Sequence, residues 1–145
     1  MNENDILPRM IRDHCKIEKL LDQFEESAKK DRSTMMKSFN KFEWKLEKHI
    51  FVEEKAIFTS YNPEDATEGY KMLPELTKQH NEILNRLSLM RRSIRSQRLV
   101  EDVYSFKEFM IKHKNFEERE VYPKLDEALD KTQKKHIIER IDEIV

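Results

Sequence analysis

Two histidines in this sequence are each followed four residues later by a glutamate. The pairs are His49 with Glu53 and His113 with Glu117, and residues four apart share one face of an α-helix. In both predicted helices this face also carries apolar side chains, which places the glutamates in a core. A buried carboxylate is costly unless it is paired, protonated or bound to a metal ion. The spacing therefore predicts two buried glutamates that need a partner, and a metal ion is one such partner.

Two further histidines extend this pattern into an internal repeat. The run His14-x-x-Ile17-x-x-x-Leu21 recurs as His80-x-x-Ile83-x-x-x-Leu87, and each run precedes one of the histidine–glutamate pairs. Both pairs are followed by a second glutamate, a basic residue, a variable residue, an aliphatic residue and an aromatic one. The chain is therefore predicted to consist of two similar helical hairpins, which a pseudo-twofold axis could relate.

Prolines and helix-capping residues divide the chain into four long helices and a short fifth one. Pro8 follows the cap-like pair Asn4 and Asp5, and Pro123 is expected to stop the fourth helix. The predicted helices cover about residues 7–29, 33–58, 74–97, 99–122 and 132–144, with a turn cluster at 59–65. The third helix would start at Gly69 instead if Pro74 lies in its early turn. Long helices with short connections favour an up-down-up-down antiparallel four-helix bundle with a short C-terminal fifth helix, in one all-α domain of residues 1–145.

The composition agrees with helices and disfavours other classes. The 145 residues include one glycine, against roughly ten in an average chain of this length, and the tight hairpins of sheets need glycine or asparagine. An all-β or Rossmann-type fold is therefore disfavoured. The 28 Lys and Arg nearly balance the 29 Asp and Glu, so the net charge gives no argument for a nucleic-acid or membrane partner.

Two negative features indicate the compartment. No apolar stretch is long enough for a signal peptide or a membrane span. The single cysteine, Cys15, excludes an intrachain disulfide framework. We therefore expect a cytoplasmic protein without a membrane partner.

The positions of the histidines and glutamates along the helices bring them to one level of such a bundle. His14 and His80 lie about two turns after the starts of the first and third helices, and the other four residues lie within about three turns of the ends of the second and fourth. In the expected topology those are the same end. Four imidazoles and two carboxylates make a nitrogen and oxygen site suited to iron, and two glutamates suit bridging between two ions. The candidate metal ligands are His14, His49, Glu53, His80, His113 and Glu117.

With these motifs the chain resembles the hemerythrin-like, or HHE cation-binding, domain family. The resemblance rests on the two copies of His-x-x-x-Glu-Glu, continued by Lys-Ala-Ile-Phe and by Arg-Glu-Val-Tyr-Pro, and on one histidine in each of the first and third helices. It extends over essentially the whole chain. It implies a non-haem centre of two iron ions inside a four-helix bundle, with the six candidate residues as the matching ligands.

The sequence departs from oxygen-carrying hemerythrins at two places. Leu84 stands where those proteins have a second histidine on the third helix, and the last ligand pair here is His113 and Glu117 instead of a histidine followed five residues later by an aspartate. With an oxo or hydroxo bridge from water, each iron would then keep roughly one open position. We expect Leu84→His to add a ligand. Because each iron would keep an open position, more than one function is compatible with the site.

Three functions are compatible with such a centre. The first is a di-iron protein that engages oxygen, nitric oxide or a peroxide as sensor, carrier or protective redox protein. The second is an iron-handling module, or one whose metal controls partner binding. The third is repair of iron–sulfur centres. This function is disfavoured because relatives with that role tend to carry a cysteine-bearing segment before the bundle, whereas this chain is expected to begin its bundle almost immediately. In all three we expect a metal and small-ligand binding protein rather than a dedicated enzyme.

Simpler interpretations compete for several residues near these motifs. The histidines could be satisfied core residues and the glutamates solvated. Glu54 and Glu118 lie about 100° from the ligand face, so they are expected to be surface charges or hydrogen-bond acceptors of the ligands. Cys15 is expected to be a small packing residue and His136 an ordinary surface residue, while Tyr61 and Tyr122 could line the mouth of the site.

Two patterns on the helix surfaces have ordinary explanations as well. The run of arginines from Arg86 to Arg98 could bind phosphates, but arginines along a helix usually form a solvated face with acidic neighbours, so nucleic acid is not the expected partner. Trp44, Phe51 and Phe58 recur every seven residues. This second apolar stripe is expected either to receive the fifth helix or to form a contact between copies of the chain.

Overall fold

The computed structural model describes residues 5–58, 72–96 and 103–144, and within them every regular element is a helix. Five helical rods result, two of which contain a short π-helical segment. The elements are α1 (Ile6–Ser27), α2 (Arg32–Val52) continued by the π segment η1 (Glu53–Ile57), α4 (Leu73–Arg95), α5 (Val103–Phe116) continued by the π segment η3 (Glu117–Val121) and by α6 (Tyr122–Ala128), and α7 (Lys131–Ile144). The predicted all-α class is confirmed.

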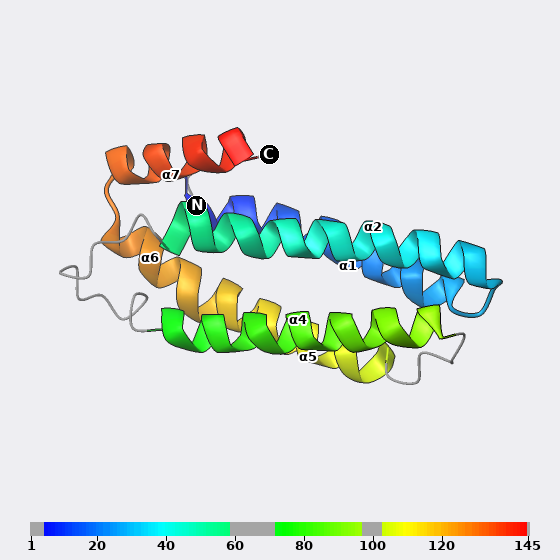
Figure 1. Cartoon of the computed structure of the whole chain (residues 1–145). Coiled ribbons are helices and arrows are strands. Elements are labelled where there is room, and N and C mark those ends of the chain that lie inside the picture. Colours follow the sequence, from blue (N-terminus) through cyan, green and yellow to red (C-terminus); the bar gives the residue numbers. More distant parts are fainter. Residues whose placement is uncertain (1–4, 59–71, 97–102, 145) are drawn as a thin grey trace.

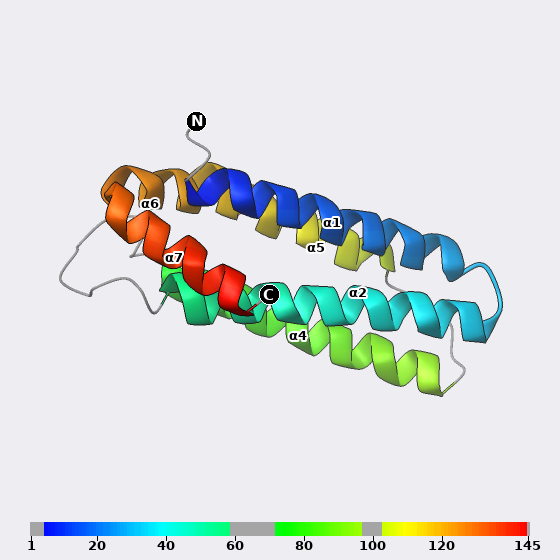
Figure 2. The ribbon, with the colours of Figure 1, turned by 90° about the horizontal axis from the view of Figure 1, so that it is seen from above.

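The four long rods lie side by side as a bundle, and α7 runs back over α1 and α2 near one end of it (Figures 1 and 2). Figures 1 and 2 show α1 beside α2, and α4 beside the rod formed by α5, η3 and α6. The amphipathic helix α7 turns Ile137 and Ile141 inward, where they join a core cluster with Met10 and Val52. The helix α7 therefore covers one side of the bundle, near the end where both π segments lie.

Two carboxylates fix the starts of the first two helices. Asp31 caps α2 by accepting the Thr34 N–H at 2.8 Å, as its cap-type chemistry predicts. The start of α1 is capped from a distance, because the Asp126 carboxylate accepts the backbone N–H groups of Ile6 and Leu7 at 2.8 and 3.0 Å. Asp5 occupies the N-cap position, as its cap-like type predicts, but its side chain makes no cap hydrogen bond. Asp126 of α6, near the end of the fourth rod, thus caps the N-terminus of α1.

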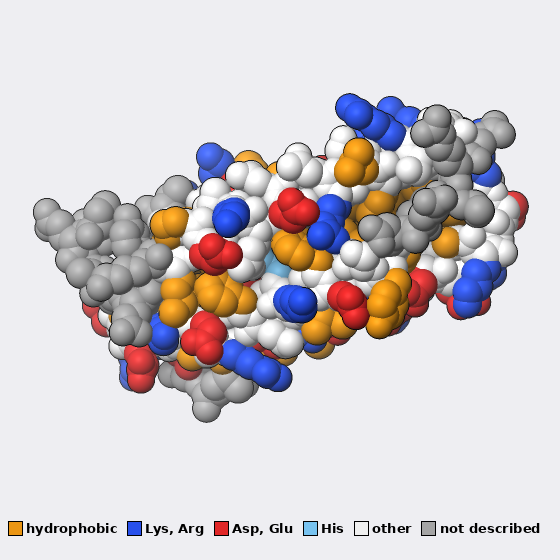
Figure 3. Space-filling model, turned by 90° about the horizontal axis from the view of Figure 1, so that it is seen from below, with side chains coloured by type: hydrophobic (Ala, Val, Ile, Leu, Met, Phe, Trp, Pro, Cys, Tyr) orange, Lys and Arg blue, Asp and Glu red, His pale blue; other side chains and the backbone are white. Residues whose placement is uncertain are grey.

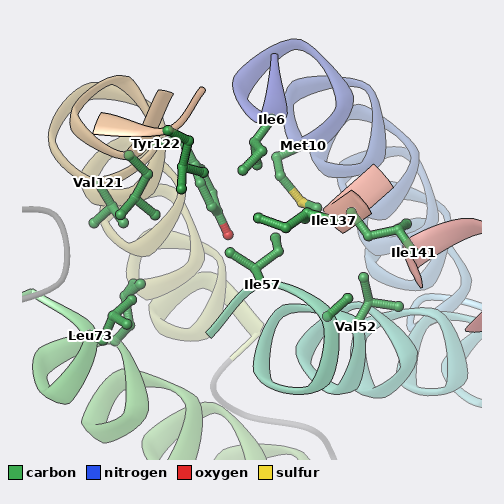
Figure 4. Packing of buried hydrophobic residues seen from close by; sticks show 13 residues of the cluster. Ile6, Met10, Val52, Ile57, Leu73, Val121, Tyr122, Ile137 and Ile141 are labelled. Carbon is green, nitrogen blue, oxygen red and sulfur yellow. The ribbon is translucent and has the colours of Figure 1, made fainter. Parts of the chain in front are cut away.

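The apolar core consists of two clusters. One cluster, shown in Figure 4, lies at the α7 end and contains Ile57 and Tyr122. The other lies toward the opposite end and is rich in phenylalanines, including Phe24, Phe42 and Phe106, of which Phe42 and Phe106 pack edge to face at 5.9 Å. Along α1, Met10 belongs to the first cluster and Ile17 to the second. The residues between them, including His14, are therefore held at a fixed level by apolar packing on both sides.

Pro123 does not end the fourth long helix, which is a correction to the sequence prediction. The rod continues through α6 to Ala128, with Pro123 in the first turn of α6. The preceding segment, η3, is a π-helix, whose backbone hydrogen bonds span one residue more than those of an α-helix. A change of hydrogen-bond register at this point leaves a place for a residue without an N–H, as at the first turn of any helix.

The second apolar stripe does not hold together as the seven-residue spacing predicts. Trp44 and Phe51 are 63% and 50% exposed, so α7 does not cover them. Phe58 instead packs against the core and stacks on the ring of His80, with centroids 5.9 Å apart. The π segment η1 intervenes between Phe51 and Phe58 and changes the helical phase. A contact between copies through Trp44 and Phe51 stays a prediction.

The surface arginines behave as the simpler interpretation predicts. Arg86 pairs with Glu82 at 2.9 Å and lies over the ring of Phe109, and Arg91 pairs with the buried Glu43. Arg98, Tyr61 and the predicted turn at 59–65 lie outside the described residues. No helix among the described residues is long and apolar enough to cross a membrane.

Candidate metal centre

The four histidines of the repeat meet inside the bundle as two pairs. His14 of α1 and His49 of α2 lie edge to face with ring centroids 4.9 Å apart. His80 of α4 and His113 of α5 do the same at 5.3 Å. We call the first pair half-site 1 and the second pair half-site 2. Each helical hairpin therefore supplies one pair, as the internal repeat predicts.

The two glutamates lie between these pairs and connect them. The Oε1 atom of Glu117 is 3.1 Å from Nε2 of His14 and 3.0 Å from Nε2 of His113. The Oε1 atom of Glu53 is 2.9 Å from Nε2 of His49 and 3.4 Å from Nε2 of His80. Each carboxylate thus contacts one histidine of each half-site through the same oxygen.

The centre is closed off from solvent by the surrounding helices. The four histidines are 0–5% exposed and both glutamates are fully buried. Figure 3 shows one face of the molecule, where only a small area of histidine surface appears between hydrophobic side chains. All six predicted site residues are therefore in the core and in mutual contact, and the alternative of solvated glutamates is wrong.

Three of the ligand atoms in the centre make close contacts that are not hydrogen bonds. Among the described residues, Nε2 of His49, Oε1 of Glu53 and Nε2 of His80 are buried without a hydrogen-bond partner. They are nevertheless close, at 2.9 Å for the first two atoms. Nitrogen and oxygen ligands about 2.1 Å from one ion and at right angles lie about 3 Å apart. Two ions, one beside His49 and the other beside His80, would satisfy all three of them.

Two groups of ligand atoms meet the distance requirements for binding a metal ion. Within each group the atoms lie within 4.8 Å of one another. One group consists of His14, His49 and Glu117, and the other of Glu53, His80, His113 and Glu117. Glu117 belongs to both, so the two candidate ion positions are adjacent.

Both glutamates begin a π-helical segment, which the sequence prediction missed. Glu53 is the first residue of η1 and Glu117 the first of η3, and single π turns are frequent at functional sites. A signal for them exists in the sequence. The inward positions 113, 117, 121 and 125 follow one another at intervals of four, whereas an α-helix has 3.6 residues per turn. A sustained spacing of four requires a wider turn.

Every histidine is held from behind through its other ring nitrogen. Nδ1 of His14 donates to Glu118 at 2.6 Å, and Nδ1 of His80 donates to Glu54 at 3.2 Å. These contacts confirm that Glu54 and Glu118 serve as hydrogen-bond acceptors. Such partners fix the tautomer and the ring orientation of a histidine that binds a metal through Nε2.

The corresponding partners of the other two histidines were not predicted. Nδ1 of His49 donates to Asp13 at 2.5 Å, and Nδ1 of His113 donates to Gln79 at 2.7 Å. Asp13 and Gln79 each directly precede a histidine of the repeat. Their equivalent positions were the available signal, because α1 is adjacent to α2 in one hairpin and α4 to α5 in the other.

Tyr122 is part of the centre and does not line its mouth. Its side chain is fully buried, and Figure 4 shows its hydroxyl reaching into the middle of the bundle. The hydroxyl lies between Oε2 of Glu117, at 3.0 Å, and Oε2 of Glu53, and shares its single proton with these two acceptors. Burial and the charges of both glutamates raise the pKa of Tyr122 well above 10, so the hydroxyl keeps its proton and remains a donor.

In the metal-free chain the buried charges compensate one another. Burial lowers the pKa of His14, but hydrogen bonds to Glu117 and Glu118 outweigh it and raise the pKa to about 9. For His49, burial is outweighed by the charge of Glu53 and the hydrogen bond to Asp13, and the pKa rises to about 10. The pKa of His80 rises to about 9 against burial, mainly through Glu53. A binding metal ion must displace these protons.

The same interactions act on the carboxylates. Burial raises the pKa of Glu53, but the charge of His49 and several hydrogen bonds outweigh it and hold the pKa well below its usual value. The pKa of Asp13 is also lowered, because hydrogen bonds and charges from His49 and Lys45 outweigh its burial. Ionised carboxylates are the form that binds metal ions.

A largely apolar pocket of about 250 Å³ adjoins the centre. His14, His49 and His113 line it together with apolar side chains of α1, α2 and α5, which are Ile17, Leu21, Leu46, Met110 and Ile111. The lysines at this pocket are paired, Lys107 with Asp22 and Lys114 with Glu18. The pocket therefore offers a small molecule an apolar space beside the histidines.

The residues His136, Cys15 and Leu84 all lie at least partly exposed on the helix surfaces. His136 is exposed on α7 and stands apart from the centre, as expected. Cys15 is exposed, so its expected role in packing is wrong; it points away from the core face occupied by its neighbour His14. Leu84 is 38% exposed, whereas a ligand would have to be buried, so the expectation that Leu84→His would add a ligand is not supported.

Comparisons with known proteins agree with this geometry. The hemerythrin HHE cation-binding domain matches residues 5–125 of the chain. Curated proteins and solved structures gave no match. The matched range begins just before α1 and ends within α6, so it contains all six residues of the centre. The chain therefore belongs to the family of hemerythrin HHE cation-binding domains.

Proposed function

We propose that this protein binds two iron ions and uses them to engage oxygen, nitric oxide or a peroxide, as a sensor, carrier or protective redox protein. One observation carries the proposal: four imidazole Nε2 atoms converge on two buried carboxylates, at 2.9–3.4 Å from their oxygens. Three of the atoms involved have no hydrogen-bond partner among the described residues. A pair of cations would complete all these contacts.

The arrangement of the side chains supports a division of the ligands between two ions. His14 and His49 would hold one ion and His80 and His113 the other, with Glu53 and Glu117 shared. Imidazole nitrogens and carboxylate oxygens suit iron, and neither group of ligand atoms contains sulfur. When bound, the iron pair supplies redox chemistry and open coordination positions for a small ligand. The protein's own part is to orient the rings, keep Glu53 ionised and exclude bulk water.

The pocket beside half-site 1 supports a small uncharged ligand. Its walls are mainly aliphatic, and the two lysines at it are already paired with carboxylates. A charged ligand would lose its hydration there without gaining a free counter-charge. Oxygen and nitric oxide lose little on entering such a space.

The placement of the residues also supports the expected topology and extent of the domain. His14 and His80 lie early in α1 and α4, while Glu53 and Glu117 directly follow the ends of α2 and α5. The contact between the starts of two helices and the ends of the other two supports an up-down-up-down order. The packing of Ile137 and Ile141 of α7 into the same core supports a single domain that includes residues beyond the matched range.

The test combines iron loading with a change at the pocket. The chain is loaded with ferrous iron without oxygen, and nitric oxide is then added while optical and electron paramagnetic resonance spectra are recorded. Ile111 lines the pocket and is 44% exposed, so Ile111→Trp should narrow the entrance without disturbing the core. We expect at least a tenfold slower reaction with unchanged iron content. Leu89→Trp, at a residue of α4 that is 61% exposed, is the matched control.

Two results would count against the proposal. A loaded protein whose spectra do not change on addition of nitric oxide, oxygen or peroxide has no open position for a small ligand. A protein that instead releases its iron readily on reduction is an iron-handling module, which is the alternative function. An equal rate for both tryptophan variants and the unaltered chain would show that the pocket is not the route to the iron.

A further inference from the structure

The two half-sites have the same inner residues but different partners behind them. In half-site 1 both Nδ1 atoms donate to carboxylates at short distances, His14 to Glu118 at 2.6 Å and His49 to Asp13 at 2.5 Å. In half-site 2 the contact of His80 with Glu54 is longer, at 3.2 Å, and His113 donates to the neutral amide oxygen of Gln79 at 2.7 Å. The repeat is therefore broken at one pair of equivalent positions, 13 and 79.

The Asp13 carboxylate is held in position beside His49 by a second contact. Its side chain is only 23% exposed, and its second oxygen accepts from Lys45 at 2.8 Å. Lys45 and His49 lie four residues apart on α2, so one helix holds both oxygens of the carboxylate. Lys45 offsets part of the negative charge but leaves the hydrogen bond to His49 in place.

A carboxylate and an amide differ in their effect on a histidine ligand. A carboxylate that accepts the Nδ1–H of an imidazole increases the basicity of Nε2, and this strengthens the bond to a metal ion. Hydrogen bonds to an ionised acceptor are about twice as strong as those to a neutral one. Changes in such outer partners typically alter metal affinity by roughly 10–100-fold.

We propose that the two ion positions are unequal, and that Asp13 makes half-site 1 the position that fills first and empties last. This inference rests on the proposed two-ion function. Asp13 is a positioning residue, since it acts on the ion through His49 and does not touch it. The protein would then pass through a defined half-loaded state, with the ion held by His14 and His49 beside the apolar pocket.

The test is a titration of the metal-free full chain with ferrous iron in the absence of oxygen, followed by calorimetry. We expect two binding steps whose dissociation constants differ by at least tenfold. Asp13→Asn keeps the shape and the acceptor but removes the charge, so it should weaken the tighter step by roughly 10–100-fold and merge the two steps. Gln79→Glu should strengthen the weaker step by a similar factor. Glu26→Gln, on the same helix but exposed and paired with Lys29, should change neither.

A second measurement locates the first ion. At one equivalent of Co²⁺, the proton spectrum should show shifted ring N–H signals of His14 and His49 and unshifted signals of His80 and His113. Circular dichroism of each metal-free variant checks that it folds, and Gln79→Glu predicts a gain that misfolding cannot imitate. Two equal steps in the unaltered chain, or unchanged steps in both variants, would overturn the inference while leaving two ions per chain. A capacity of one ion would overturn the proposed function itself.

Discussion

The N-terminal hairpin of α1, α2 and η1 and the C-terminal hairpin of α4, α5, η3 and α6 build the same inner centre. Each supplies two histidines, one glutamate at the start of a π segment and a second glutamate one residue later. They differ in the layer behind, where Asp13 stands in one hairpin and Gln79 in the other. The repeat therefore preserves the groups that would touch metal and the glutamates behind His14 and His80, while the acceptors behind His49 and His113 differ.

A second difference concerns the residue that ends each motif. Phe58 of the first hairpin stacks on His80, whereas Tyr122 of the second shares its hydroxyl proton with both glutamates. The two residues hold equivalent places in the repeat. One contact is specific to half-site 2, and the other acts on the shared carboxylates and hence on both half-sites. Substitutions can therefore be chosen to affect one half-site or both.

The largest effect is expected from removing one histidine of either half. His49→Ala and His113→Ala should each reduce the bound iron from two ions to one per chain, because each leaves one half-site intact. The ion that remains should be the tighter one in His113→Ala and the weaker one in His49→Ala. Metal analysis after dialysis against increasing ferrous iron measures both quantities.

The exposed His136 provides the control for these two variants. His136→Ala should keep both ions, since this residue lies on the outer face of α7. Equal loss of iron in all three variants would show that the assignment of the centre is wrong. Equal affinity of the remaining ion in His49→Ala and His113→Ala would show that the two halves are equivalent.

A smaller effect, shared by both halves, is expected for Tyr122→Phe. The change leaves buried oxygens of Glu53 and Glu117 without their donor, which costs about 1–3 kcal/mol. Urea unfolding of the metal-free protein should show this loss, and the affinity for both ions should fall by a similar factor. Tyr104→Phe is the matched control because Tyr104 is 71% exposed. A loss confined to one ion would contradict the shared role of Tyr122.

The last expected effect is a pH dependence of the metal-free protein. The pKa values of His14, His49 and His80 are raised to about 9, 10 and 9 in the folded chain, against about 6.5 when unfolded. The folded state thus binds more protons between these values, and its stability should fall as the pH rises from 7 to 10. Melting temperatures across this range measure the loss, which metal-bound histidines should not show because they are already neutral.

Asp13→Asn allows the pH experiment to distinguish half-site 1 from half-site 2. The hydrogen bond from His49 to Asp13 contributes to the raised pKa of His49, so the variant should lose less stability over this range. A metal-free protein whose melting temperature rises from pH 7 to pH 10 would contradict the charge pattern described for the centre.

The amino-acid sequence is sufficient to predict the six inner residues and their convergence. Helical periodicity determines which residues share a face, and distance from a helix end determines their level, so His14 and His80 can be matched with Glu53 and Glu117 from their spacing. The same rules place Glu54 and Glu118 one step off the face, where they reach the backs of His80 and His14.

The remaining features depend on how the helices approach one another. The π segments shift the phase of each helix after its glutamate, which turns Phe58 and Tyr122 toward the core. Asp13 and Gln79 reach a histidine on a neighbouring helix, so periodicity within one helix does not reveal them. The continuation of the fourth rod through Pro123 follows from the same change of hydrogen-bond register.

The central claim, that the two hairpins together hold two ions, is tested most directly by the iron content at saturation. The metal-free full chain is dialysed without oxygen against increasing ferrous iron, and iron and protein are measured in the same sample. We expect a plateau of two iron ions per chain, approached in two steps. A plateau of one ion per chain, or retention of zinc with no iron bound, would contradict the claim.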